Sequence, residues 1–173
     1  MRREGREGLL AVDDGEEVFL THHDRSNLYV LAGSGSPEEG EALTDKLAAQ
    51  IIEMLASDFA YVVVDTAAGL DERALVAVDH ATDCVLLASM DVASIRNLAK
   101  EIDALDRMAM VGAQRHFILN RADTRVGLEV ADVESAIGMR VDAALPSSRA
   151  VPLAMNRGHA VVLESPTPRW PNS

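Results

Sequence analysis

Aromatic residues are scarce in this chain of 173 residues, where Phe, Trp and Tyr together make up 3%. A core must therefore be aliphatic, which the hydrophobic content of 48% allows. A single cysteine, Cys84, excludes an internal disulfide and suits a reducing compartment. No apolar run approaches the roughly 20 residues of a membrane-spanning helix. We therefore expect a cytoplasmic protein without a direct membrane anchor.

Positive charge is also in short supply. Lys and Arg number 16 against 28 Asp and Glu, which gives a net charge of −12 at pH 7. Non-specific binding to a nucleic acid needs clustered Lys and Arg that displace counterions from the phosphates. Adhesion to an anionic membrane surface needs a similar cluster. The charge balance therefore argues against a nucleic-acid partner and against direct membrane contact.

Apolar runs that suit strands alternate with apolar stripes that suit helices. The expected strands are a short one in NLYVLAGSGS, then 61–65, 83–89, 116–119 and a last one stopped by Pro146. The expected helices are a long one before 61, one over 71–80, one capped by Asp91, one closed by Gly138 and one ending near Arg157. Such alternation predicts an α/β fold with a mostly parallel, doubly wound sheet flanked by helices.

The long first helix has a clear expected start. Ser36, Pro37 and Glu39 have the pattern of a capped helix N-terminus. Apolar residues then repeat at every fourth position, at Leu43, Leu47, Ile51 and Leu55. Such a stripe is expected to face a sheet.

Three segments are expected along the chain. Residues 1–27 are a charged arm, or a fragment of an N-terminal part that lies outside this chain. Residues 28–165 form the α/β domain. Residues 166–173 are rich in proline and form a disordered tail.

One acid stands at the end of an apolar run. Asp65 follows Tyr61–Val64, and Thr66, two alanines and Gly69 come next. The carboxyl ends of strands in open α/β sheets bind ligands, and a carboxylate there can hold the water shell of Mg²⁺. The alternative is a polar residue that merely ends a strand, and the residues of this segment alone leave both interpretations open.

Four segments together resemble the MinD/ParA superfamily of deviant P-loop ATPases. VVVDTAAGLDE is similar to its Walker B and switch II segment, and FILNRAD to its strand ending in Asn-Arg. CVLLASMDVASIRNLAKEIDAL is similar to the strand and helix between them, and its SIRN is closest to the CpaE-like (TadZ-like) branch of Flp/Tad pilus assembly. ALPSSRAVPLAMNRGHAVVLESP is similar to the closing segment, so the resemblance covers residues 28–166.

The resemblance implies a set of site residues and partners. Asp65 would be the catalytic residue and would hold Mg²⁺ through water, while Thr66 and Gly69 would belong to the switch II loop. The residues implied for binding the adenine base of ATP are Asn120, Arg121, Pro146 and Ser147. The implied partners are a second copy or a complementing chain, together with pilus or polarity machinery that could hold the protein at the inner face of the membrane.

The phosphate-binding part of that family's pattern is missing. The family's phosphate loop is glycine-rich and ends in Gly-Lys-Thr or Gly-Lys-Ser, whereas Lys46 and Lys100 are the only lysines here and neither follows a glycine. The resemblance places the loop upstream of Met1. Without the lysine and its backbone N–H groups, the β- and γ-phosphates lack their usual charge neutralisation. We therefore expect weak or absent nucleotide binding and no catalytic competence in this chain.

Two other functions stay open. The chain could be a non-catalytic interaction module that kept the fold and lost nucleotide turnover. It also resembles, more distantly, a phospho-receiver domain, in which Asp13 and Asp14 would share Mg²⁺ with Asp65 and Ser89 would be the switch hydroxyl. That domain needs a lysine after the following strand, and FILNRAD has none.

Two further candidates have simpler explanations. His22, His23 and Asp24 could ligate a metal, but adjacent residues of an extended segment point in different directions. Cys84 opens a buried strand and is expected to pack as a small hydrophobic residue.

Overall fold

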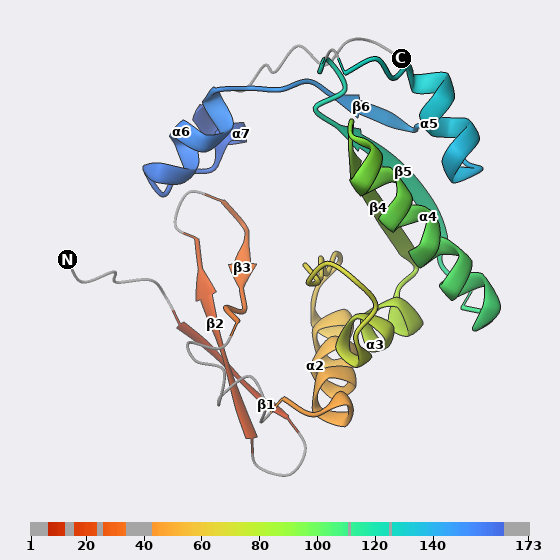
Figure 1. The fold of residues 1–173 in the computed structure, drawn as a ribbon. Coiled ribbons are helices and arrows are strands. Elements are labelled where there is room, and N and C mark those ends of the chain that lie inside the picture. The colour runs from red at the N-terminus through yellow and green to blue at the C-terminus, as the bar shows by residue number, and fades with distance from the viewer. Residues whose placement is uncertain are drawn as a thin grey trace. The chain divides into compact units, whose positions relative to one another are not determined.

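The computed structural model describes two compact units of the chain, unit 1 (Met1–His80) and unit 2 (Ala81–Ser173) (Figure 1). The described residues are 7–12, 16–23, 26–33, 43–110, 112–124 and 126–164, with the backbone alone for 7–12, 16–18 and 164. Each unit has its own hydrophobic core. The expected helix start at Ser36, Pro37 and Glu39 and the expected tail 166–173 lie outside these residues.

Unit 1 contains an antiparallel sheet in the order β1 (Glu7–Val12), β2 (Glu16–His22) and β3 (Tyr29–Val30). The register pairs β1 with β2 along the full length of β1. Residues 1–27 were expected to be a charged arm or a fragment of an N-terminal part; the pairing of β1 with β2 corrects the expectation of a loose arm, and the second alternative stays a prediction. An antiparallel sheet tolerates charged residues on a solvated face, so charge did not exclude a strand here.

The helix α2 (Asp45–Asp58) covers this sheet. Leu20 of β2 is 4% exposed, and the side chains packed against it are Leu47, Ile51, Met54, Leu55 and Phe59. The expected stripe is thus confirmed from Leu47 onward, although the sheet it faces was not predicted. The Thr44 hydroxyl accepts a hydrogen bond from the Leu47 N–H at 3.2 Å and caps α2.

The strand expected over residues 61–65 is wrong. No strand is assigned between α2 and α3 (Glu72–His80), and Tyr61 and Val63 are 91% and 92% exposed. A parallel strand obtains its hydrogen bonds from neighbouring strands, and the described residues of unit 1 provide none for this segment. The apolar run indicated a tendency to be buried, but burial also requires a neighbour that the sequence pattern does not identify.

Unit 2 is built on a parallel sheet in the order β4 (Asp83–Ser89), β5 (Gln114–Asn120) and β6 (Ala143–Leu145). The strands expected at 83–89 and 116–119 are confirmed. Leu86, Ala88, Phe117 and Leu119 alternate with more exposed neighbours and lie in the core. This alternation gives the sheet one buried face.

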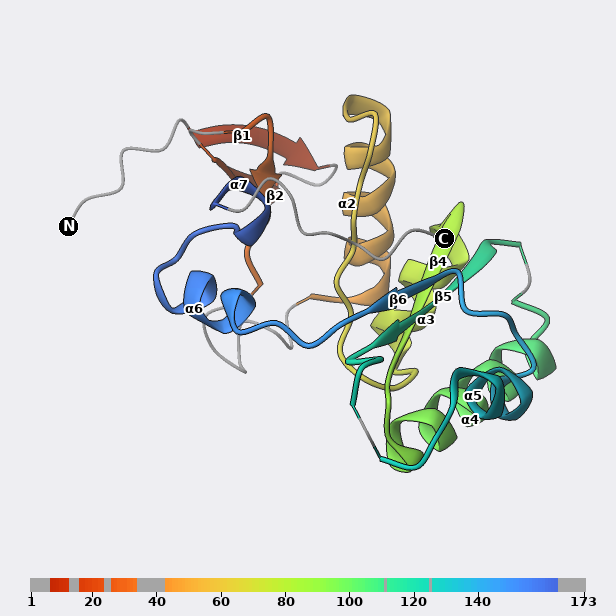
Figure 2. The ribbon, with the colours of Figure 1, turned by 90° about the horizontal axis from the view of Figure 1, so that it is seen from above.

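Two helices cover that buried face. Figure 2 shows α4 (Val92–Arg107) and α5 (Val130–Ile137) lying on the same side of the three strands. Asp91 caps α4 as expected, and Gly138 closes α5 in the left-handed conformation with φ 76°. The prediction of an α/β fold with a parallel sheet flanked by helices is confirmed.

Two short helices follow the sheet. They are α6 (Ala150–Asn156) and α7 (Val161–Glu164), and they contact each other. The helix expected to end near Arg157 is α6. None of the helices described is long and apolar enough to cross a membrane.

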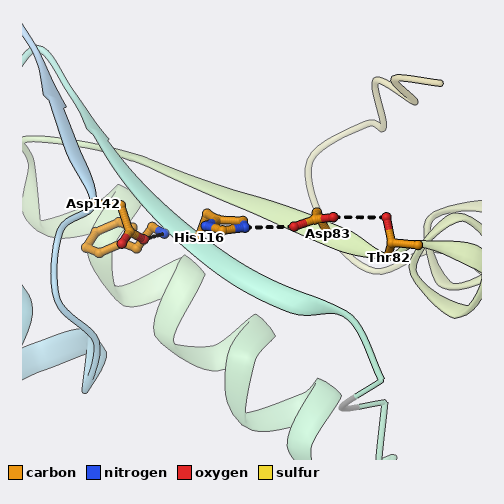
Figure 3. A network of polar contacts seen from close by, with 5 residues as sticks. Thr82, Asp83, His116 and Asp142 are labelled. Carbon is orange, nitrogen blue, oxygen red and sulfur yellow. Dashed lines mark hydrogen bonds and ion pairs between the residues drawn. The ribbon is translucent and has the colours of Figure 1, made fainter. Parts of the chain in front are cut away.

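A row of polar side chains ties the beginnings of β4 and β5 together (Figure 3). The His116 ring lies 2.9 Å from an Asp83 carboxylate oxygen, and the Thr82 hydroxyl donates to the other oxygen at 2.9 Å. These hydrogen bonds, His116 first, hold the pKa of Asp83 below its ordinary value. On the other side of β5, an Asp142 carboxylate oxygen accepts from the Phe117 N–H at 2.8 Å.

Phe117→Ala is expected to destabilise unit 2. Phe117 is fully buried between the sheet and its helices, and removing such a ring costs about 3–5 kcal/mol. Urea unfolding followed by circular dichroism would measure the loss. Val85→Ala, at a position that is 53% exposed, is the control and should change the unfolding free energy far less. Equal losses in the two variants would contradict the assignment of the core.

His116→Gln is expected to raise the pKa of Asp83, because it removes the ring contact and the charge that favour the carboxylate. A depressed pKa means that this contribution to stability is present above the ordinary pKa and is lost as the pH falls through the folded-state value. An NMR titration of the Asp83 carboxyl carbon would measure the shift. Lys100→Gln, on the exposed surface of α4, is the control, and an unchanged pKa in His116→Gln would refute the assigned cause.

Candidate functional site

The carboxyl ends of the three parallel strands lie at one level. Ser89 is in register with Asn120, and Asn120 with Leu145, so β4, β5 and β6 end together. The Met90 N–H donates to the Asn120 carbonyl at 3.1 Å, which holds the segment after β4 beside the end of β5. Loops at this edge of a parallel sheet are where open α/β proteins bind ligands. Four of the expected site residues lie at or next to this edge, namely Asn120, Arg121, Pro146 and Ser147.

Asn120 ends β5 as expected, with its side chain partly buried. Its Oδ1 accepts a hydrogen bond from the Arg121 N–H at 2.9 Å. A backbone N–H is always a donor, so this bond fixes the orientation of the amide and identifies Nδ2 as the opposite end. The amide therefore offers its NH₂ group as the donor best placed for a ligand acceptor.

Arg121 follows in a left-handed backbone conformation, with φ 53°. This conformation is unfavourable for a residue with a side chain and tends to persist where surrounding contacts require it. The Thr124 N–H donates to the Arg121 carbonyl at 3.0 Å and closes a turn. The Ala122 N–H donates to the Leu145 carbonyl at 3.0 Å, so this turn is attached to the end of β6.

Asp123 makes a second link between the two segments. One of its carboxylate oxygens accepts from the Ser147 N–H at 2.6 Å. Hydrogen bonds from the Ser147 backbone and then from its hydroxyl hold the pKa of Asp123 below its ordinary value. Asp123 was not among the expected site residues. The signal in the sequence that could have indicated Asp123 is its place three residues after Asn120, which ends a strand.

The segment with Asp65 belongs to unit 1. Asp65 and Thr66 are exposed, and Asp65 ends no strand, which corrects the expectation that it follows one. Gly69 has φ 97°, a conformation that favours glycine. The Asp71 carboxylate accepts from the Ala74 N–H at 2.8 Å near the start of α3. The roles expected for Asp65, Thr66 and Gly69 stay predictions.

The described residues contain no group of three or more His, Cys, Asp or Glu side chains placed to hold a metal ion. The His22 and Tyr29 rings contact each other in a tilted arrangement with centroids 4.8 Å apart, and His23 Nδ1 lies 2.9 Å from the Ser26 hydroxyl. Cys84 packs against the core of unit 2, and burial raises the pKa of its thiol. It is therefore poorly suited to act as a nucleophile.

Comparison with known proteins gives consistent similarities. No family model matches the chain. The chain is 29% identical over 160 residues to the septum site-determining protein MinD of Escherichia coli, a match that spans 86% of this chain and 59% of that protein. The chain thus spans somewhat more than half the length of the relative it matches.

Solved structures share the fold. A ParA family ATPase from Chlorobium tepidum matches with a TM-score of 0.79 at 20% identity, over 84% of this chain and 61% of that one. MinD of Pyrococcus horikoshii complexed with Mg-ADP matches at 0.72, with 19% identity over 85% and 60% of the two chains. A MinC:MinD complex from Aquifex aeolicus matches at 0.71, with 22% identity over 87% and 61%. The chain is therefore similar in sequence to MinD proteins over most of its length and has a fold found in MinD and ParA-family ATPases.

Proposed function

We propose that this chain is the C-terminal portion of a MinD/ParA-like ATP-binding protein of the CpaE-like branch, which serves localisation or pilus assembly. The observation that supports this most is the common end of β4, β5 and β6, where Asn120 ends β5 and the segment with Ser147 follows the adjacent strand β6. The MinD structure from Pyrococcus horikoshii, which shares the fold, is a complex with Mg-ADP. The SIRN segment and the acidic charge favour the pilus branch over a DNA-binding one.

The base end of a nucleotide fits the described site better than its phosphate end. The fixed amide of Asn120 presents a donor to a ring nitrogen of adenine, and the adjacent Pro146 and Ser147 are exposed at the same edge. At the phosphate end, no lysine of the chain follows a glycine. ATP and Mg²⁺ would be the ligands of the complete protein, and the residues of this chain would orient the base without supplying a phosphate cradle.

A second candidate function is a non-catalytic interaction module, and the open side of the β4–β6 sheet favours it. Among the described strands of unit 2, β4 pairs with β5 alone. Val85 and Leu87, on the face away from α4 and α5, are 53% and 55% exposed. An edge strand with apolar neighbours is a template for another chain. A complementing chain or a second copy would cover it, and the MinC:MinD complex shows that a protein of this fold binds another protein.

ADP is expected to bind weakly, with a dissociation constant on the order of 1 mM, because only the base end is held. Amide NMR spectra during an ADP titration should show shifts at Asn120 and Ser147. Asn120→Ala should abolish the shifts, whereas Asn97→Ala, a control on the exposed surface of α4, should preserve them.

With Mg-ATP, the chain should show no turnover above buffer. Mg²⁺-dependent turnover that Asp65→Ala abolishes would contradict the proposal.

Replacing Val85 and Leu87 together by lysine is expected to reduce association with other chains. Two charges on the exposed face of the edge strand oppose the addition of a strand from another chain. Sedimentation velocity at rising concentration would measure the association. The matched control replaces the exposed apolar pair Val151 and Leu153 of α6 by lysine and should leave it unchanged. A clean monomer of the unaltered chain at all concentrations would speak against an edge that recruits another chain.

A further inference from the structure

Two hydrogen bonds join the segment after β5 to the end of β6 and to the segment that follows β6, and they differ in kind. The first, from the Ala122 N–H to the Leu145 carbonyl at 3.0 Å, is a backbone bond that continues the pairing of the strands. The second, from the Ser147 N–H to the Asp123 carboxylate at 2.6 Å, depends on one side chain and joins positions 24 residues apart. The backbone bond is available to any sequence, whereas the second bond requires an acceptor at position 123.

The position of this second bond follows from Pro146. β6 ends at Leu145, and proline has no N–H group, so Ser147 has the first backbone donor after the strand. Pro146, Ser147 and Ser148 are all exposed and pack against no core. A segment without buried contacts keeps one conformation only where hydrogen bonds hold it. The Asp123 carboxylate accepts from the N–H of Ser147 at 2.6 Å, and so restrains this segment at its first backbone donor.

The turn after β5 places the two functional groups at its two ends. Asn120 stands before the left-handed Arg121, and its amide is fixed by the Arg121 N–H. Asp123 stands two residues after Arg121, within the turn closed by the bond from Thr124 to Arg121. The same strained turn therefore orients the amide of Asn120 and directs the carboxylate of Asp123 toward Ser147.

We propose that Asp123 is a positioning residue that holds the Pro146–Ser148 segment beside Asn120 and thereby shapes the base end of the nucleotide site. This inference rests on the proposed function, since the ligand that it serves is the adenine base of a nucleotide. The Ser147 N–H engages Oδ1 of Asp123, and the proposed role rests on this bond and on no contact with the base. It would act on affinity through the loop.

The test compares Asp123→Asn and Asp123→Ala with the unaltered chain in two NMR measurements. Exchange of the Ser147 amide hydrogen should be several-fold faster in Asp123→Ala, and intermediate in Asp123→Asn, whose neutral oxygen still accepts a hydrogen bond. In the unaltered chain the protection should persist above the ordinary pKa of Asp and disappear as the pH falls through the lowered folded-state pKa. In Asp123→Asn it should not vary with pH beyond the intrinsic rate.

The second measurement is the ADP titration, with the affinity read from the Asn120 and Ser147 amides. Both variants should bind ADP several-fold more weakly while their thermal midpoints stay close to that of the unaltered chain. The matched control is Asp132→Asn, because the exposed Asp132 carboxylate also accepts a backbone N–H, that of Glu129, at 2.9 Å. It should change neither the Ser147 exchange nor the ADP affinity.

The outcomes separate this inference from the function on which it rests. If ADP shifts the amides of the unaltered chain but Asp123→Ala leaves both affinity and Ser147 exchange unchanged, the role of Asp123 is refuted and the nucleotide site stands. If exchange rises while affinity stays the same, the bond is structural only and the role is again refuted. If ADP shifts no amide of the unaltered chain, the nucleotide site falls, and the role of Asp123 falls with it.

Discussion

The parallel pairing of β4, β5 and β6 is the constraint on which the candidate site depends. The register aligns Ser89, Asn120 and Leu145, so three loops leave the sheet at one edge. Phe117 and Leu119 hold β5 against α4 and α5, because both side chains are fully buried on the covered face. A slip of one residue would turn these side chains to the other face. The core thus fixes the register, and the register brings Asn120 at the end of β5 beside the segment that follows β6.

Much of unit 2 could be predicted from sequence because its signals are local. The apolar run at 83–89, the cap at Asp91 and the closing glycine at Gly138 each specify structure through near neighbours, and the structure has all three. Unit 1 was harder. The run at 61–65 signals a strand, yet the partner that a strand requires is set by tertiary contacts that no local pattern specifies.

The candidate site likewise contains features that local sequence predicts and contacts between distant segments that it does not predict. Asn120 could be placed from FILNRAD, because a residue that ends a buried strand lies at the ligand-binding edge. The contact of Asp123 with Ser147 could not be foreseen, since it joins two loops that are distant in sequence. The left-handed conformation of Arg121 was equally hidden, because arginine carries no preference for it. A sequence therefore predicts which edge of the sheet holds the site more readily than it predicts the hydrogen bonds that join the loops there.

Cys84 carries the only thiol of the chain, and this thiol is a native reporter of local opening around β4. Thiolate, the species that alkylating reagents attack, is disfavoured while the side chain packs against the core beneath β4. Because the thiol is only partly buried, its alkylation rate would depend both on its raised pKa and on how closely β4 packs against the helices. The reactivity of this one sulfur atom would therefore change if another polypeptide covered the β4 edge.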